Sequence, residues 1–224
     1  MTKEAELLAN HEIMLKEIRS WGLWSLGLGV VHLISSGFLN SSWGILLIIV
    51  GLSSFYYRTA PMFIMYTVTL SWAALSNLLS FNTEWVIFSV LQGYFAFRTL
   101  QDFRRFRNTE DELKLITKGV SNNIQRVAKS FPWIGAILSC LSVFTCIASI
   151  LIVFFVIDET LVESFSYPPY LSLMFGLIET FSVLGFSVSL ISLISKYKPK
   201  ILPIIGIVIS GLFMVLEIIS RFSI

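Results

Sequence analysis

The chain has 224 residues and a net charge of only +2, with 55% hydrophobic and 13% charged residues. Soluble domains carry about 25% charged residues, so this composition excludes an ordinary soluble globule. The small net charge also excludes a nucleic-acid-binding protein and a disordered chain. Two cysteines are too few for a disulfide framework. The composition therefore predicts a protein that crosses a lipid bilayer several times.

The first segment, residues 1–20, predicts an amphipathic helix that lies along the membrane surface. Leu7, His11, Met14 and Ile18 recur at helical spacing, and charged residues occupy the positions between them. The glutamates of this segment do not fit a signal peptide, whose first part is basic. We expect residues 1–20 to form a separate unit on the inner surface of the membrane.

Seven apolar stretches follow, and a helix needs roughly 20 apolar residues to cross a bilayer core of ~30 Å. All Lys and Arg residues except Arg221 fall in alternate connections, so the positive-inside rule predicts a cytoplasmic N-terminus and an outside C-terminus. We expect an all-α integral membrane protein of seven transmembrane helices in a 4+3 arrangement. The short loops fit a prokaryotic cytoplasmic membrane. The expected spans are residues 21–40, 43–57, 61–81, 85–100, 132–157, 170–195 and 201–220.

An internal repeat covers part of the first membrane half, residues 21–107. The sequence from residue 38 to 55 aligns with that from residue 80 to 97, and each copy has a polar turn followed by a late glycine. This half is therefore predicted to consist of two duplicated helical hairpins. The matched pairs are Asn40 and Asn82, Trp43 and Trp85, Ile45 and Ile87, Gly51 and Gly93, and Phe55 and Phe97.

Residues 108–130 are expected to be a cytoplasmic, basic, amphipathic linker before the three-helix half, residues 131–224. Just before the linker, Arg104, Arg105 and Arg107 lie beside two phenylalanines. Such a cluster can contact anionic lipids or a partner. It can also be a basic loop that only orients the protein in the membrane, and the sequence leaves both interpretations open.

Small residues follow one face of the fifth and seventh spans. Membrane helices associate through close packing of such residues and through hydrogen bonds. The pattern predicts a packing face within one chain or between chains. Its members are Gly135, Ser139, Ser142, Cys146 and Ser149 in the fifth span, and Gly206 and Ser210 in the seventh.

Three polar side chains are expected near the middle of the bilayer: His32, Gln92 and Glu179. A carboxyl group at that depth is costly and is by default a functional hypothesis. Glu179 could bind a proton, an ion or a substrate group, with His32 and Gln92 as secondary candidates. It could equally be a protonated side chain that hydrogen-bonds across a packed interface.

Catalytic patterns are missing from the sequence. The two histidines belong to no metal-ligand motif, and no serine nucleophile elbow or phosphate-binding glycine loop occurs. We therefore expect a non-enzymatic protein with no cofactor and no metal.

The expected partners of the protein are the lipid bilayer and other membrane subunits or further copies of itself. The function expected first is that of an accessory or assembly subunit or an oligomeric scaffold. The alternative is a small proton-coupled or ion-conducting transporter centred on Glu179.

Overall fold

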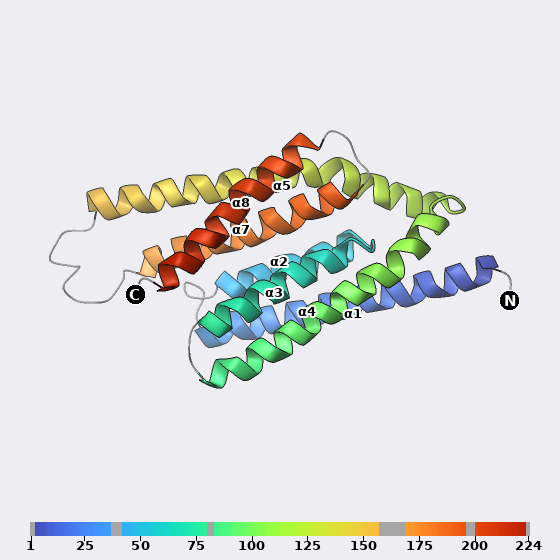
Figure 1. Ribbon diagram of the computed structural model, residues 1–224, viewed down its shortest axis with the longest axis horizontal. Helices are drawn as coiled ribbons and strands as arrows, with labels where there is room; N and C mark the ends of the chain where they lie inside the picture. The colour runs from blue at the N-terminus through green and yellow to red at the C-terminus, as the bar shows by residue number, and fades with distance from the viewer. Residues whose placement is uncertain (1–2, 37–41, 80–82, 157–168, 196–199, 223–224) are drawn as a thin grey trace.

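The computed structural model describes residues 3–36, 42–79, 83–156, 169–195 and 200–222, and these residues form seven helices. The expectation of an all-helical fold is therefore confirmed for the described part of the chain. In chain order the helices are α1 (Lys3–Ser36), α2 (Ser42–Tyr56), α3 (Met62–Leu79), α4 (Thr83–Leu113), α5 (Lys118–Val156), α7 (Pro169–Ile194) and α8 (Ile201–Phe222) (Figure 1).

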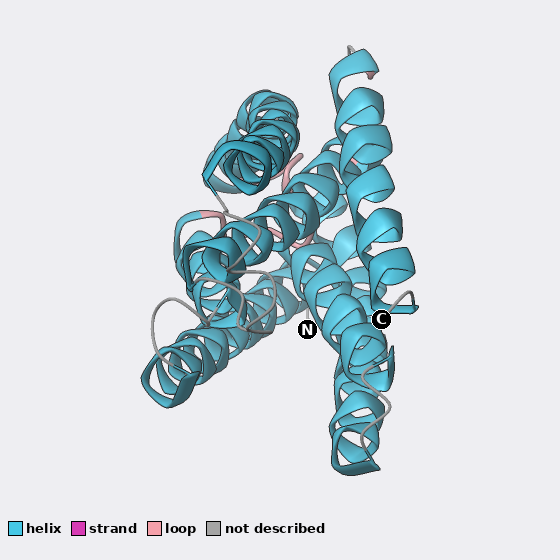
Figure 2. Ribbon diagram, turned by 90° about the vertical axis from the view of Figure 1, so that its left-hand side faces the viewer, coloured by secondary structure: helices cyan, strands magenta, loops and turns pink. Residues whose placement is uncertain are grey.

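The helices form two groups that meet at α7. Helix α1 packs against α2, and α3 packs against α4, as two helical hairpins. Helices α5, α7 and α8 pack against one another, and α7 also contacts α2 and α3. Figure 2 shows the helices of both groups from one end of the molecule. The two termini lie at opposite ends of the molecule (Figure 1), as expected for an odd number of passes along the long axis.

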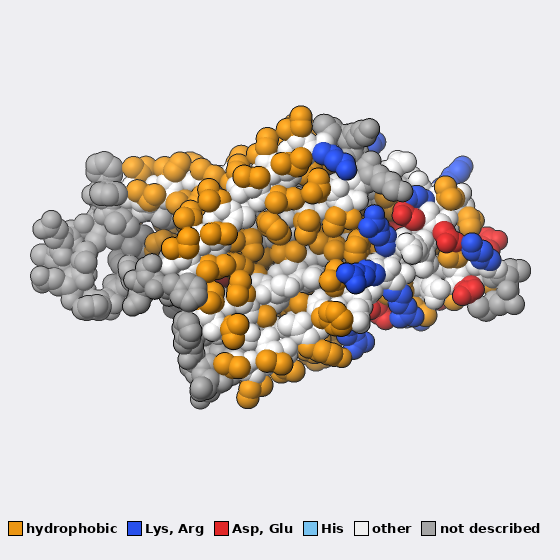
Figure 3. All heavy atoms as spheres, viewed as in Figure 1, with side chains coloured by type: hydrophobic (Ala, Val, Ile, Leu, Met, Phe, Trp, Pro, Cys, Tyr) orange, Lys and Arg blue, Asp and Glu red, His pale blue; other side chains and the backbone are white. Residues whose placement is uncertain are grey.

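Four helices are long and apolar enough to cross a membrane, and α2 contributes a shorter apolar helix, Trp43–Tyr56. Large hydrophobic side chains cover the outside of this region, and Figure 3 shows them as a broad apolar band. Soluble monomers rarely expose such a surface, so the band is the surface that lipid would cover. The four long segments are Met62–Leu79, Val120–Ile152, Leu173–Ile194 and Ile201–Ile219.

Three helices are longer than the hydropathy pattern indicates. Helix α1 passes residue 20 without a break, α4 continues to Leu113, and α5 begins at Lys118 and runs through Pro132. In the described residues, α1 is therefore continuous from residue 3 past residue 20, and residues 108–130 comprise the end of α4, a short turn and the start of α5. The reason is physical: backbone hydrogen bonds continue a helix whether its side chains face lipid or water.

These extensions form one charged end of the molecule, which we call the basic end. It consists of residues 3–20 of α1, 98–113 of α4 and 118–131 of α5, at the end where the N-terminus lies (Figures 1 and 3). Its interior is apolar and aromatic. Phe63 stacks on Phe106 with ring centroids 5.9 Å apart, and Tyr57 meets Phe131 edge-on at 4.7 Å. The amphipathic pattern of residues 1–20 thus buries Met14 and Ile18 against protein.

Candidate functional site

Glu179 lies in α7 at the contact between the two helix groups. Its side chain is only 8% exposed. The indole N–H of Trp72 in α3 donates a hydrogen bond of 2.8 Å to its Oε1 atom. Because α3 belongs to the first group and α7 to the second, this bond connects the two halves of the protein. A carboxyl group buried in this way needs such donors, since an unpaired buried polar group is costly.

The other two polar candidates lie elsewhere. Gln92 in α4 accepts a 2.7 Å hydrogen bond from the side-chain amide of Asn77 in α3. His32 is exposed on α1, a helix that packs mainly against α2 and α4. His32, Gln92 and Glu179 thus lie on three different helices, α1, α4 and α7. Trp72 is the close neighbour of Glu179 that the sequence did not reveal.

The small-residue face of α5 and α8 is an interface within this chain. The hydroxyl of Ser139 lies 2.8 Å from that of Ser210 and donates to the backbone carbonyl of Gly206 at 3.1 Å. The hydroxyl of Ser182 in α7 donates to that of Ser142 at 3.2 Å. Ser149 is also buried, but Cys146 is half-buried. In the single chain described, these residues therefore pack against one another.

Helix α7 supplies the third side of this interface, which the sequence analysis missed. A Cβ atom on Gly135 or on Gly206 would collide with the hydroxyl of Ser189, and one on Gly185 would lie 3.0 Å from the Oγ atom of Ser139. The signal was present in the sequence. Ser182, Gly185 and Ser189 recur at spacings of three and four residues, the same pattern as in α5.

Arg104, Arg105 and Arg107 of α4 lie at the basic end, and two of them cover aromatic rings. The guanidinium of Arg105 lies 5.1 Å from the ring centroid of Phe106, and that of Arg107 lies 5.7 Å from that of Phe103. Both rings are buried. Arg105 and Arg107 therefore cover part of the core of the basic end, although all three arginine side chains are exposed.

Glu110 is a buried carboxyl group that the sequence analysis did not identify. It is 5% exposed, and its Oε2 atom accepts a 3.0 Å hydrogen bond from the backbone N–H of Ala60, just before α3 begins. Its Oε1 atom has no hydrogen-bond partner among the described residues. Burial raises the pKa of Glu110 to about 7, despite the opposing effect of the Ala60 hydrogen bond. In sequence this glutamate is one of several acids in a polar stretch, which predicts exposure rather than burial.

Two further carboxyl groups at the same end, Glu17 of α1 and Asp102 of α4, also have raised pKa values. Burial raises the pKa of Glu17, and the nearby charge of Asp102 raises it further. Burial also raises the pKa of Asp102, while Arg98, Arg105 and a hydrogen bond from Trp21 act in the opposite direction. The basic end thus holds three carboxyl groups that bind protons more tightly than usual.

Within the described ranges, no group of three or more His, Cys, Asp or Glu side chains is arranged to hold a metal ion. In comparisons with protein-family models, with curated proteins and with solved structures, nothing matches this chain. Its class therefore comes from its own fold. It is an all-helical protein in which several helices are apolar enough to associate with a membrane.

Proposed function

We propose that the protein is a non-enzymatic, multi-pass membrane protein that acts through association. Its role would be that of an accessory or assembly subunit, or of an oligomeric scaffold. Because the small-residue face packs within the chain, we infer that the contact to a partner lies elsewhere. The basic end offers such a contact.

The observation that supports this proposal is an exposed apolar tip at the turn between α4 and α5. Leu115 is 84% exposed and Ile116 is 53% exposed, although the turn lies at the charged end and away from the apolar band. Backbone hydrogen bonds fix the turn: the N–H groups of Ile116 and Thr117 both donate to the carbonyl of Leu113, at 3.0 and 2.8 Å. A partner that covers these side chains would bury them in the core of an interface, which is more apolar than its rim.

The basic end is also a connected unit. An ion pair of 3.0 Å between Lys3 and Glu112 connects the start of α1 to the end of α4. The exposed fractions of its two side chains are 80% and 48%. At that exposure the pair contributes little stability, but it holds the charged ends of two helices next to the apolar tip. A partner would thus meet two aliphatic side chains bordered by charges of both signs.

The test is the native size and composition of the complex, measured by native mass spectrometry after gentle extraction. We expect the wild-type chain to come with stoichiometric partner subunits or further copies of itself. The double variant Leu115→Ser/Ile116→Ser should lose them, and Lys118→Ser, which changes an exposed residue nearby, should keep them. A wild-type monomer without foreign subunits would refute the proposal.

The proposed topology is seven transmembrane helices, with a cytoplasmic N-terminus, an outside C-terminus and a duplicated hairpin in the first half. The sidedness of Lys and Arg supports it, as does the position of the two termini at opposite ends. Single cysteines at positions 41 and 160 should react only from outside, and one at position 58 only from the cytoplasm. The native Cys140 and Cys146 are replaced first, because Cys140 is exposed.

A second candidate function is proton-coupled or ion-conducting transport centred on Glu179. The bond between this buried carboxyl group and Trp72 across the contact of the two groups favours it, because movement of one group against the other would make or break the bond. Proton flux into liposomes tests it. Glu179→Gln keeps an acceptor for Trp72, so it should abolish flux while leaving thermal stability unchanged. The same measurement on His32→Ala and Gln92→Ala tests the secondary candidates.

A further inference from the structure

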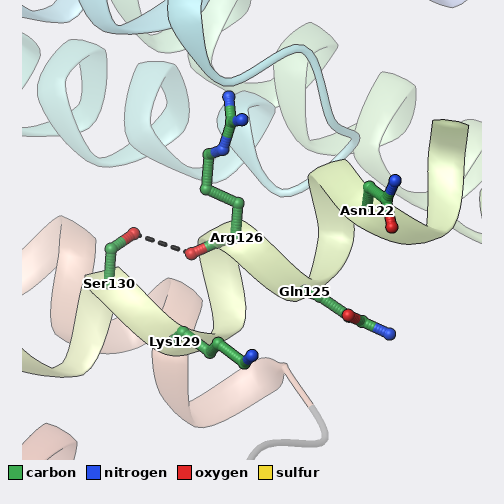
Figure 4. A pocket seen from close by; sticks show the side chains of 5 residues that line it. All are labelled: Asn122, Gln125, Arg126, Lys129 and Ser130. Carbon is green, nitrogen blue, oxygen red and sulfur yellow. Dashed lines mark hydrogen bonds between the residues drawn. The ribbon is translucent and has the colours of Figure 1, made fainter.

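A shallow hollow on the surface of α5 is lined by basic and polar side chains. Its volume is about 530 Å³, and it is open to the outside rather than enclosed. Figure 4 shows the side chains that line it along one stretch of the helix, with Arg126 extending toward the connection between α2 and α3. The lining residues are Asn122, Gln125, Arg126, Lys129 and Ser130.

The position of the hollow is at the border between the basic end and the apolar band. Residues 122, 125, 126 and 129 have the three- and four-residue spacing that places side chains on one face of a helix. Lys129 is the last charged residue before an apolar run that reaches residue 157. Trp133, one turn further along, is 61% exposed. Exposed tryptophans are enriched at the level of lipid headgroups.

The chemistry of the hollow fits an anion. Its lining includes two cations, Arg126 and Lys129, and two side-chain amides, those of Asn122 and Gln125, and it includes no carboxylate. The fifth residue, Ser130, already donates its hydroxyl to the backbone carbonyl of Arg126 at 2.8 Å (Figure 4). The guanidinium of Arg126 lies 5.3 Å from the ring centroid of Tyr56, which is itself 61% exposed. A guanidinium held over an aromatic face keeps its N–H groups available at its edge, where they can bind phosphate oxygens in pairs.

We propose that this hollow binds a phosphate group, and that the headgroup of an anionic phospholipid supplies it. The lipid is favoured over free phosphate because the hollow adjoins the apolar band, where an acyl chain could lie. The site differs from the arginines of α4, of which Arg105 and Arg107 lie over phenylalanine rings of the protein core. It does not depend on the proposed role in association.

The experiment uses the full-length protein in nanodiscs of phosphatidylglycerol or of phosphatidylcholine, and separately in detergent with inorganic phosphate. Native mass spectrometry counts the retained lipid, and thermal unfolding reports stabilisation by either ligand. In the variant Arg126→Gln/Lys129→Gln, phosphatidylglycerol should bind roughly thirtyfold more weakly, since each basic residue near a membrane surface contributes roughly a five- to sixfold step. Lys118→Gln, on the same helix but outside the hollow, should bind like the wild type.

Arg126→Lys keeps the charge and tests the geometry. It should fold like the wild type and retain less phosphatidylglycerol, because lysine lacks the planar pair of donors. Retention of phosphatidylglycerol that inorganic phosphate does not displace supports the lipid headgroup as the source. Stabilisation by inorganic phosphate alone, lost in the double variant, supports a phosphate site filled from solution. Equal retention by the wild type and the double variant, with no response to phosphate, would overturn the proposal.

Discussion

Replacing Glu110 by glutamine should remove a pH dependence from the stability of the protein. The folded protein holds this carboxyl group buried, with one oxygen bonded to the N–H of Ala60 and the other unpartnered among the described residues. Burial raises its pKa from an ordinary value of 4.5 to about 7. The folded state therefore keeps the proton of Glu110 over a pH range in which the unfolded chain has lost it.

The sign and size of this change in stability with pH follow from proton linkage. Stability rises with pH only where the unfolded state binds more protons, and here the folded state binds more. The contribution of Glu110 is fully present below pH 4.5 and is lost as the pH rises through about 7. Each pKa unit corresponds to 1.36 kcal/mol, so the total loss is ~3 kcal/mol. For a chain of this size that equals a decrease in melting temperature on the order of 6–12 °C.

The assay is thermal unfolding in detergent at a series of pH values from 4 to 8, on the wild type and on Glu110→Gln. The difference in stability between the two proteins at each pH reports the contribution of Glu110 alone, because Glu17 and Asp102 contribute equally to both. The wild type should lose stability relative to the variant between pH 4.5 and about 7. Glu112→Gln, at an exposed position of the same helix, should behave like the wild type. A difference between the wild type and Glu110→Gln that stays constant with pH would refute the assignment of a raised pKa.

Two further predictions concern packing between helices. Gly206→Ala should destabilise the protein by about 1–3 kcal/mol, because its new Cβ atom would collide with the Ser189 hydroxyl. Gly27→Ala, where nothing lies within 4 Å, should be neutral or stabilise by up to ~1 kcal/mol, so equal effects at the two glycines would contradict the packing argument. Trp72→Phe removes a donor from Glu179 and should cost about 1–3 kcal/mol, measured by the same thermal unfolding. A cost as small as that of Glu179→Gln, which preserves the hydrogen bond, would show that the bond contributes nothing.

The sequence predicted the shorter apolar helices within about two residues. The stretches expected at 43–57, 61–81, 170–195 and 201–220 correspond to α2, α3, α7 and α8. Hydropathy works well here because each helix is bounded by a polar turn or a charged connection. The long helices α1, α4 and α5 were less predictable. Each crosses from an apolar to a charged environment, and a change of hydropathy does not end a helix.

The candidate site residues also fall into a group that the sequence predicted and a group that it did not. Sequence alone identified Glu179 and the small-residue spacing in α5, because a carboxyl group in an apolar run and a periodic set of serines and glycines are visible without a structure. It could not identify the partners of these residues. Trp72 is 107 positions from Glu179, and Ser139 is 71 positions from Ser210.

The sequence by itself determined the class of the protein, since the excess of apolar residues and their arrangement in helix-length stretches depend on composition and order alone. Only the tertiary structure decided which polar groups are buried and what they contact. Glu110 illustrates this difference. It lies in a charged stretch, yet the turn before α3 folds over it and excludes water, because burial depends on which distant segment packs against a side chain.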